Sequence, residues 1–233
     1  MIKNIVSGHF NHTRICYNEH NAGKKKCQAR QGGISMKTKK TVSVQTIAVI
    51  ALLAALSYAC FTFLQFKIPL PGGDATSIHL GNSICVLGAL LFGGLYGGLG
   101  GAIGMTIGDL FDPIYIVYAP KTFILKFFIG LNTGFVAHKI LHVSKHTDNK
   151  KKLTTRAAIA GACGLLFNCI FDPLLGYYYK LLILGKPAAE LTLAWNIGAT
   201  AINAVTSTIV AIAVYVVLIA AMKKAGLFRD ILK

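Results

Sequence analysis

One glycine-rich apolar stretch limits how this chain can fold more than any other feature of the sequence. Residues 91–113, LFGGLYGGLGGAIGMTIGDLFDP, place eight glycines in an otherwise apolar run. In a water-soluble helix each glycine costs roughly 1 kcal/mol relative to alanine, whereas in a bilayer glycines four residues apart let two helices pack backbone to backbone. The glycines form two such rows: Gly93, Gly97 and Gly101, and Gly100, Gly104 and Gly108. The stretch therefore predicts a tight helix-turn-helix that turns near residues 93–98 and whose second helix packs on both sides.

The same glycines also match a dinucleotide-binding pattern, Gly94-xxx-Gly98-x-Gly100. That fingerprint requires a preceding strand, a following helix and a βαβ context, and the apolar segments around it are too long for strands. A chance match is expected in a run with so many glycines. The sequence has no GxxxxGK[ST] loop either, so we do not expect this chain to hydrolyse ATP itself.

The composition indicates an integral membrane protein. The chain is 54% hydrophobic and only 14% charged, against about 25% charged residues in an ordinary soluble domain. Its net charge of +16 does not indicate nucleic-acid binding, because the lysines and arginines fall in a few blocks between apolar runs, as in cytoplasmic loops. The cysteines show no paired spacing and four lie in apolar segments, which is typical of small hydrophobic residues in a reducing compartment.

Residues 1–35 differ from the rest of the chain. They are polar and basic, and they lack the apolar region of a signal peptide. We expect a disordered N-terminal extension, or a start assigned upstream of Met36, with the membrane domain over residues 36–233. A metal site here is not expected, since no pair has the Cys-x2-Cys spacing of structural zinc. The residues considered for it are His9, His12, Cys16, His20 and Cys27.

Six apolar segments predict six transmembrane helices. They cover residues 42–66, 80–92, 97–110, 119–139, 157–182 and 191–222. The second and third are close to the minimum length for crossing, which suggests polar or irregular backbone lining a cavity at one end. Residues 67–79 contain two prolines, a Gly-Gly pair and an aspartate, so they are expected to form a loop.

The distribution of charge sets the orientation. The segment before the first span, the 139–156 loop and the C-terminus hold most of the lysines and arginines, and the alternate connections do not. By the positive-inside rule, the chain is predicted to be an all-α integral membrane protein, a compact bundle of six transmembrane helices with both termini cytoplasmic.

Polar side chains inside the spans mark a candidate binding site, because such groups are costly in a bilayer. They lie mainly toward the outer halves and suggest an outward-facing pocket for a small polar, partly aromatic ligand. The alternative is hydrogen bonding between helices, worth about 1 kcal/mol or less per bond. The candidate substrate-binding residues are His79, Asn82, Asp109, Lys121, Phe128, Asn132, Asn168, Asp172, Tyr178, Asn196 and Asn203.

Helical geometry assigns the candidate residues of the fourth span to different faces of the helix. At 100° per residue Lys121, Phe128 and Asn132 share one face, which we expect to look inward, while Lys126 lies on another face and is expected to matter less. The spans contain no Ser-His-Asp set, HExxH motif or paired carboxylates, so we expect neither an enzyme nor a catalytic residue, and no metal or other cofactor. A chain of carboxylates for proton coupling is also missing, so the energy for transport would come from elsewhere.

The first span carries alanines at intervals of three or four residues, at positions 48, 51, 55 and 59. Such a row serves equally for packing within the chain and for docking another membrane protein. Both alternatives stay open at this point.

Several motifs, taken in order, resemble the substrate-binding S component of an energy-coupling factor (ECF) vitamin transporter. They are the alanine-striped first helix, IHLGN before the second span, GGLYGGLGGAIG followed by GDL, and YAPKTFILKFFIG. The resemblance covers about residues 36–222 and is nearest to the branch of riboflavin, pyridoxine and hydroxymethylpyrimidine carriers.

The resemblance implies a six-helix subunit of a bacterial plasma membrane that binds a vitamin near its outer surface, with the loop after helix one as a lid. It further implies docking of Ala51, Ala55 and Ala59 on a transmembrane T component, and two cytoplasmic ATPase subunits that supply the energy. The competing hypotheses are a self-sufficient secondary carrier or channel for a small polar solute, and a membrane enzyme.

Overall fold

The computed structural model describes residues 14–18, 25–29, 43–70, 73–146, 149–185 and 189–224. The chain divides into two compact units, Met1–Thr41 and Val42–Lys233.

The first unit contains one antiparallel hairpin of strands β1 (Arg14–Asn18) and β2 (Lys25–Ala29), in which Cys16 lies opposite Cys27. The hairpin falls in the segment for which we expected disorder. The other residues considered for a metal site, His9, His12 and His20, lie outside the described residues.

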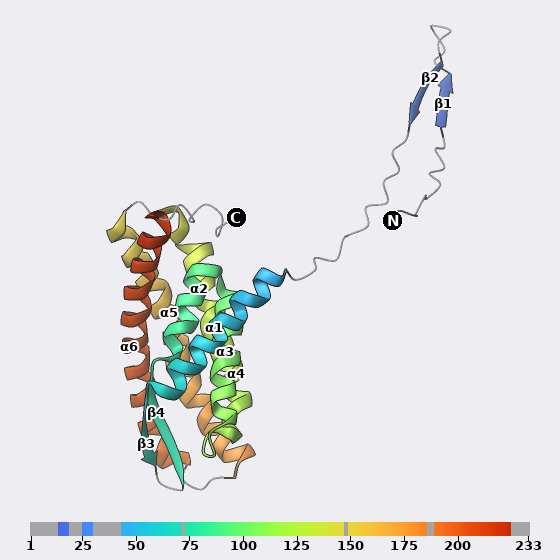
Figure 1. Ribbon diagram of the computed structural model, residues 1–233. Helices are drawn as coiled ribbons and strands as arrows, with labels where there is room; N and C mark the ends of the chain where they lie inside the picture. Colours follow the sequence, from blue (N-terminus) through green and yellow to red (C-terminus); the bar gives the residue numbers. More distant parts are fainter. Residues whose placement is uncertain are drawn as a thin grey trace, which may run out of the picture. The chain divides into compact units, whose positions relative to one another are not determined.

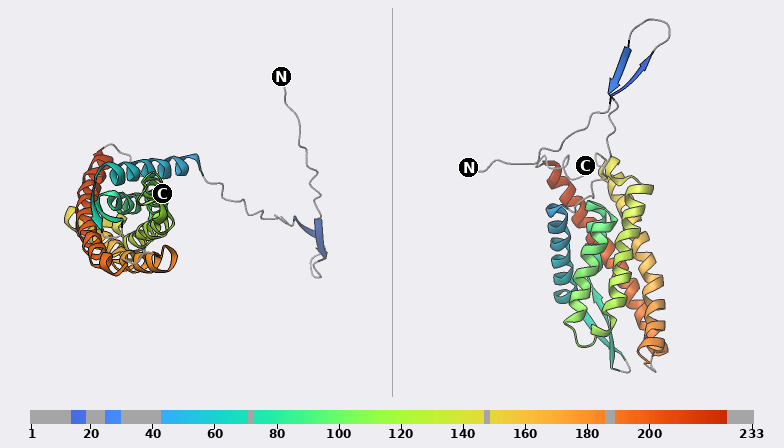
Figure 2. Two further views of the ribbon diagram at one scale, coloured as in Figure 1. Left: turned by 90° about the horizontal axis from the view of Figure 1, so that it is seen from below. Right: turned by 90° about the vertical axis from the view of Figure 1, so that its right-hand side faces the viewer.

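The second unit is built from helices that run side by side as a bundle (Figure 1, Figure 2). Its described α-helices are α1 (Val44–Phe63), α2 (Gly81–Phe92), α3 (Gly94–Leu110), α4 (Ala119–Gly134), α5 (Lys150–Tyr178) and α6 (Ala189–Lys224). Short 3-10 and π-helical turns flank them: η1 (Ile116–Tyr118), η2 (Phe135–Ile140), η3 (Val143–His146) and η4 (Tyr179–Ile183). Each predicted apolar segment thus corresponds to one helix. The chain is mostly helical, as expected.

Helix α3 packs against three neighbours through its glycines, one more than expected. A methyl group on Gly98 would overlap the backbone of α4, and Gly130 of α4 lies directly against Gly98. In the same way Gly97 lies against Ala89 of α2, and Gly104 lies against the α1 backbone. The small side chains thus let three helices approach α3 at backbone distance.

The turn between α2 and α3 is shorter than the predicted one at residues 93–98. Gly93 alone separates the two helices, with a φ of 99° that favours glycine. The remaining glycines of the expected turn belong to α3, where their lack of a side chain serves packing.

Residues 65–70 and 74–79 form a β-hairpin, so the expectations of an all-α fold and of a loop at 67–79 are wrong for these residues. Strands β3 (Gln65–Leu70) and β4 (Asp74–His79) are antiparallel, and Gly73 turns the chain with a φ of 70°. The prolines exclude a helix, and pairing with a second strand satisfies the backbone hydrogen bonds that a loop would leave open. The hairpin lies at the end of the bundle opposite the C-terminal end of α6 (Figure 1).

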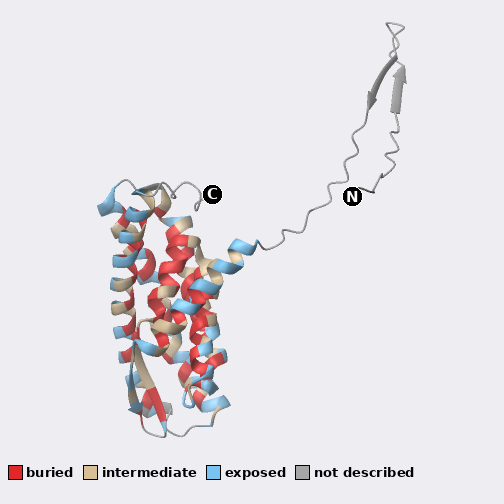
Figure 3. Cartoon of the chain, viewed as in Figure 1, coloured by how far each residue is buried: buried red, intermediate tan, exposed pale blue. Residues whose placement is uncertain are grey.

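The outside of the bundle is apolar. Large hydrophobic side chains are exposed on several helices, for example Leu52 at 62%, Leu166 at 60% and Val205 at 62%, while buried residues line the inside (Figure 3). In the described residues four helical segments are long and apolar enough to cross a membrane: Val44–Phe63, Ile116–Ile140, Lys150–Ile183 and Thr192–Lys224. Helix α2, with 12 residues, reaches only about 18 Å at 1.5 Å per residue.

We predict that Gly104→Ala strongly destabilises the bundle, because the added methyl group would overlap the α1 backbone. Overpacking of this kind costs about 1–3 kcal/mol. The same substitution at Gly198 of α6, where an added methyl group meets nothing within 4 Å, is the matched control and should not lower stability. Thermal unfolding in detergent measures both. Equal melting temperatures for the two variants would contradict the packing role of Gly104.

Candidate functional site

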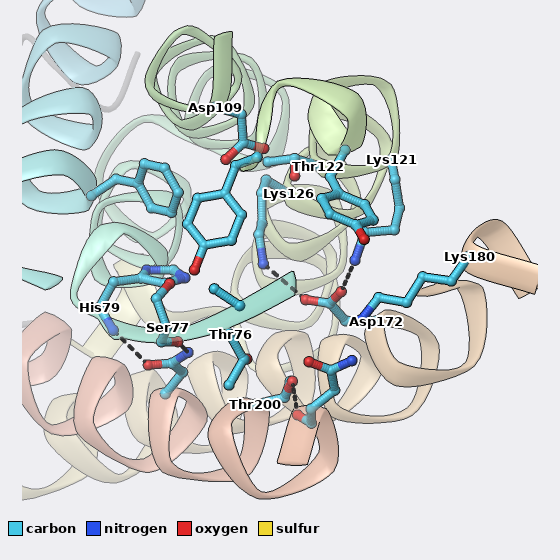
Figure 4. Close-up of a pocket in the computed structure, with 16 residues that line it drawn as sticks. Thr76, Ser77, His79, Asp109, Lys121, Thr122, Lys126, Asp172, Lys180 and Thr200 are labelled. Carbon is cyan, nitrogen blue, oxygen red and sulfur yellow. Dashed lines mark hydrogen bonds and ion pairs between the residues drawn. The ribbon is translucent and has the colours of Figure 1, made fainter. Parts of the chain in front are cut away.

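A cavity of about 100 Å³ lies at the hairpin end of the bundle (Figure 4). It is lined by α1, strand β4, η1, η4 and helices α3 to α6. Its lining residues are Phe61, Ala75, Thr76, Ser77, His79, Asp109, Tyr115, Tyr118, Lys121, Thr122, Lys126, Asp172, Lys180, Asn196, Thr200 and Asn203.

An ion-pair cluster joins α4 to α5 on one side of the cavity. Lys121 Nζ lies 2.6 Å from Asp172 Oδ1, and Lys126 Nζ lies 3.3 Å from Asp172 Oδ2. Asn168, one turn before Asp172, accepts a third bond from Lys126 Nζ at 3.3 Å. We call Lys121, Lys126, Asn168 and Asp172 the ion-pair cluster. One carboxylate is thus shared by two ammonium groups.

A second set of buried polar groups holds the hairpin to the bundle. Asp74, the first residue of β4, is 2.5 Å from Lys180 Nζ and accepts a 3.0 Å hydrogen bond from the Tyr118 hydroxyl. Lys180 also donates to Thr192 Oγ1 at 3.0 Å. These four residues, the hairpin clamp, come from β4, η1, η4 and α6. The two bonds that Asp74 makes, with Lys180 and Tyr118, thus link the hairpin to the bundle among buried groups.

Asn203 of α6 tethers the other end of β4. Its Oδ1 accepts from the His79 backbone N–H at 2.8 Å, and its Nδ2 donates to the Ser77 carbonyl at 2.9 Å (Figure 4). Both the oxygen and the nitrogen of the Asn203 side-chain amide therefore bond to the hairpin backbone. Asn203 belongs to the site chiefly as a positioning residue.

His79 is buried beside the ring of Phe61, edge to face, with ring centroids 4.8 Å apart. Burial, and to a lesser degree the Lys126 ammonium, lowers the pKa of His79 to about 3. The imidazole is therefore neutral at physiological pH, and its Nδ1 accepts from the Gly81 N–H at 3.2 Å.

Asp109 enters the cavity from the end of α3. Its side chain is buried, and Oδ2 has no hydrogen-bond partner among the described residues. The hydroxyl of Tyr115, which also lines the cavity, is a hydrogen-bond partner of the Ser77 side chain. Buried polar atoms are normally paired, so Asp109 Oδ2 is well placed to meet a ligand.

The structure brings six of the expected site residues together at the cavity: His79, Asp109, Lys121, Asp172, Asn196 and Asn203. Asn168 lies behind them in the ion-pair cluster. The other four candidates do not line the cavity. Asn82 is buried in α2, Asn132 is half-buried, and Phe128 and Tyr178 are 42% and 49% exposed.

The predicted inward face of the fourth span is wrong for Phe128 and Asn132, which do not line the cavity, whereas Lys121 does. Lys126 is 5% exposed and reaches the cavity, whereas Phe128 faces outward. The rotation of α4 follows from Gly130, which must face Gly98 of α3 because no side chain fits between them. Reading Gly130 and Gly134 as a small-residue row would have identified this face from the sequence.

Sequence reasoning also missed several lining residues, namely Thr76, Ser77, Tyr115, Tyr118 and Lys180. No local pattern distinguishes them, because they meet only when the hairpin folds back over the bundle. Lys180 lies in the π-helical turn η4, an irregularity frequent at functional sites.

The alanine row of α1 faces away from the rest of the chain. Ala51 and Ala55 are exposed and Ala59 is half-buried, while Leu53 and Ser57 on the opposite face are buried against the bundle. Intramolecular packing therefore does not account for Ala51 and Ala55.

Chemically, the cavity is suited to binding. In the described part of the chain, no group of three or more His, Cys, Asp or Glu side chains could hold a metal ion. The lining offers ammonium, hydroxyl and amide donors, one carboxylate oxygen without a partner, and aromatic walls.

Comparison with known proteins yields one family. A family model described as "ECF-type riboflavin transporter, S component" matches residues 41–224. Neither a curated protein nor a solved structure matches the chain. The match confirms the resemblance identified from the sequence motifs.

We predict that Asp172→Asn destabilises the protein more than Lys126→Met. Loss of the carboxylate leaves two buried ammonium groups without their counter-ion, at a cost of about 3 kcal/mol, whereas loss of Lys126 leaves Asp172 paired with Lys121. Thermal unfolding in detergent gives the order. Lys67→Met is the control, because Lys67 pairs with Asp112 outside the cavity and is 39% exposed. A larger loss for Lys126→Met than for Asp172→Asn would contradict the shared-carboxylate arrangement.

Proposed function

We infer the function of this chain from its family, since it belongs to the S components of ECF-type riboflavin transporters. It is a transport protein of the membrane, and the family is one of transporter subunits rather than enzymes. We propose that it captures a vitamin or vitamin precursor, of the riboflavin, pyridoxine or hydroxymethylpyrimidine type, on the outer face for ATP-driven uptake. The observation that carries the proposal is the polar cavity covered by a hairpin directly after α1.

The position of the cavity supports an outward-facing site. Lysines gather at the opposite end of the bundle, at the start of α5 and the end of α6 (Figure 1). By the positive-inside rule that end is cytoplasmic, so the cavity faces outward. We propose six crossings with both termini in the cytoplasm, in a bacterial plasma membrane, with the short helices α2 and α3 completed by the hairpin and cavity at the outer end.

The domain division remains part of the proposal: residues 36–233 form the membrane domain, and residues 1–35 are an extension outside it. The family match over residues 41–224 is consistent with this division.

We propose that partner subunits supply the energy for transport and for release of the ligand. Membership of the family implies a T component and ATPase subunits in general, and we propose one T component and two ATPases for this chain. The exposed alanines of α1 supply a surface on which a second helix can approach at close range. The competing hypothesis, a self-sufficient carrier or channel, requires no such surface.

We predict that the purified chain binds its vitamin but does not transport it in liposomes without the T and ATPase subunits. The measurement is uptake of radiolabelled ligand with and without co-reconstituted partners and internal ATP. Uptake by the chain alone, driven by an ion gradient, would establish a secondary carrier and overturn the proposal.

We predict that replacing Ala51 and Ala55 with Trp abolishes transport by the full complex, because the bulky rings hold a partner helix away, while ligand binding by the isolated chain is unchanged. Ala201→Trp on α6 is the matched control, an exposed alanine outside the proposed docking face. Loss of ligand binding in the double variant, or equal loss of transport in the Ala201 control, would contradict the assignment of this face.

A further inference from the structure

A groove of about 460 Å³ runs between the start of α5 and the last turns of α6. These two helix ends lie at the end of the bundle opposite the β3–β4 hairpin (Figure 1). The described residues that line the groove are six aliphatic side chains and three lysines, Lys150, Lys223 and Lys224. No aromatic ring, hydroxyl or carboxylate is among them. The groove is therefore both apolar and basic.

The apolar part of the groove joins the core of the bundle to its outer surface. Leu153 and Ile219 are 3% and 5% exposed and belong to the cluster of buried hydrophobic residues. Val217, which also lines the groove, is 67% exposed. A hydrocarbon chain in the groove would therefore contact protein on one side and the bilayer interior on the other.

Apolar residues and lysines follow one another in the same order along both helices. On α6, Val217, Ala221 and Lys224 share one face, because residues three and four apart are neighbours on a helix. This row spans about 10 Å at 1.5 Å per residue. On α5, which runs the opposite way, Lys150 lies one turn beyond Leu153 towards the same end of the bundle. A phospholipid has the same order, with its acyl chains towards the bilayer centre and its phosphate at the surface.

The lysines give the groove a positive charge at the level of the lipid phosphates. Lys150 and Lys224 are exposed, and neither belongs to any of the four ion pairs found among the described residues. A phosphate accepts charge-assisted hydrogen bonds from lysine, and basic pockets between transmembrane helices bind anionic head groups.

We propose that this groove binds one anionic phospholipid, with the phosphate on the lysines and the acyl chains along the apolar wall. The site goes beyond the proposed function, because it lies at the other end of the bundle from the cavity and takes a constituent of the membrane in place of the transported ligand.

Two simpler roles of the lysines do not account for the groove. Basic residues at the C-terminus of a helix favour its dipole, and lysines at one end of a bundle orient it in the membrane. Both effects need only the charge, and neither needs a hollow that reaches Leu153 and Ile219. An acidic protein surface would pair with the lysines but leave the aliphatic wall beneath them uncovered, whereas a lipid covers both.

The test is lipid binding to the full-length chain in a neutral detergent, titrated by native mass spectrometry. The probes are phosphatidylglycerol, phosphatidylcholine with the same acyl chains, and glycerol 3-phosphate as a phosphate without chains. We expect phosphatidylglycerol to bind on the order of tenfold more tightly than phosphatidylcholine, the factor that a charge-assisted hydrogen bond provides. Glycerol 3-phosphate should not displace it.

Three outcomes of this titration would overturn the proposal. Equal affinities for the two lipids would remove the role of the lysines. Displacement of the lipid by an equal concentration of glycerol 3-phosphate would assign the groove to a free phosphate. Binding of a polyglutamate peptide, with no binding of either lipid, would assign it to an acidic protein surface.

Variants of the lysines test the contact with the phosphate. We expect Lys150→Gln combined with Lys224→Gln to lower the affinity for phosphatidylglycerol to that for phosphatidylcholine. Lys139→Gln combined with Lys151→Gln is the matched control, because it removes the same charge from exposed lysines outside the lining, and it should bind normally. Equal losses in the two double variants would show that net charge, and not the groove, attracts the lipid.

A substitution in the apolar wall tests the contact with the acyl chains. Ala220→Trp places a bulky ring in the groove, and we expect affinity for phosphatidylglycerol to fall at least tenfold. Ala201→Trp, at an exposed alanine of α6 outside the groove, is the matched control. Thermal unfolding of each variant identifies any loss of fold. Unchanged affinity in a folded Ala220→Trp protein would overturn the placement of the chains.

Discussion

Backbone-to-backbone packing around α3 is the constraint on which the rest of the molecule depends. Because Gly97, Gly98 and Gly104 have no side chains, α2, α4 and α1 approach α3 on three separate sides. The same contacts set the rotation of each neighbour, and so decide which side chains reach the cavity at the end of α3. A glycine pattern that contributes no chemistry itself therefore places Lys126, and with it Asp172, in the site.

The sequence predicted the helices of the spans but not the structure of the connections between them. Each long apolar run became a helix, and Asp109 and Lys121 were found because charged groups are rare in spans. The rotation of α4 was missed, since a periodicity argument alone cannot choose between the faces of Phe128 and Lys126. The position of the β3–β4 hairpin over the site could not be predicted from the sequence. Asn203 and Asp74 hold it there only through contacts between residues far apart in the chain.

Two sets of polar groups surround the cavity, and they join different elements of the bundle. The ion-pair cluster joins α4 to α5 within the bundle and makes no contact with the hairpin that an ion pair or hydrogen bond of the described structure records. Asp74 and Asn203 connect the hairpin to the helices, through the bonds of Asp74 with Lys180 and Tyr118 and of Asn203 with the β4 backbone. Because Asp74 and Lys180 are both buried, separating them exposes two charges that must be rehydrated, which opposes opening unless water or a partner compensates.

This cost has a consequence for how binding and release are coupled. Under the proposed function, a ligand in the cavity contacts lining residues of β4 as well as of the helices, so it stabilises the arrangement in which the hairpin lies over the cavity. Ligand capture and hairpin closure then favour each other by the same free energy, as linkage requires. Under the proposed function, release then requires separation of Asp74 from Lys180, at the cost of rehydrating both charges. The arrangement of Asp74, Lys180 and Asn203 thus gives a physical reason why a subunit of this kind would depend on partners to deliver what it binds.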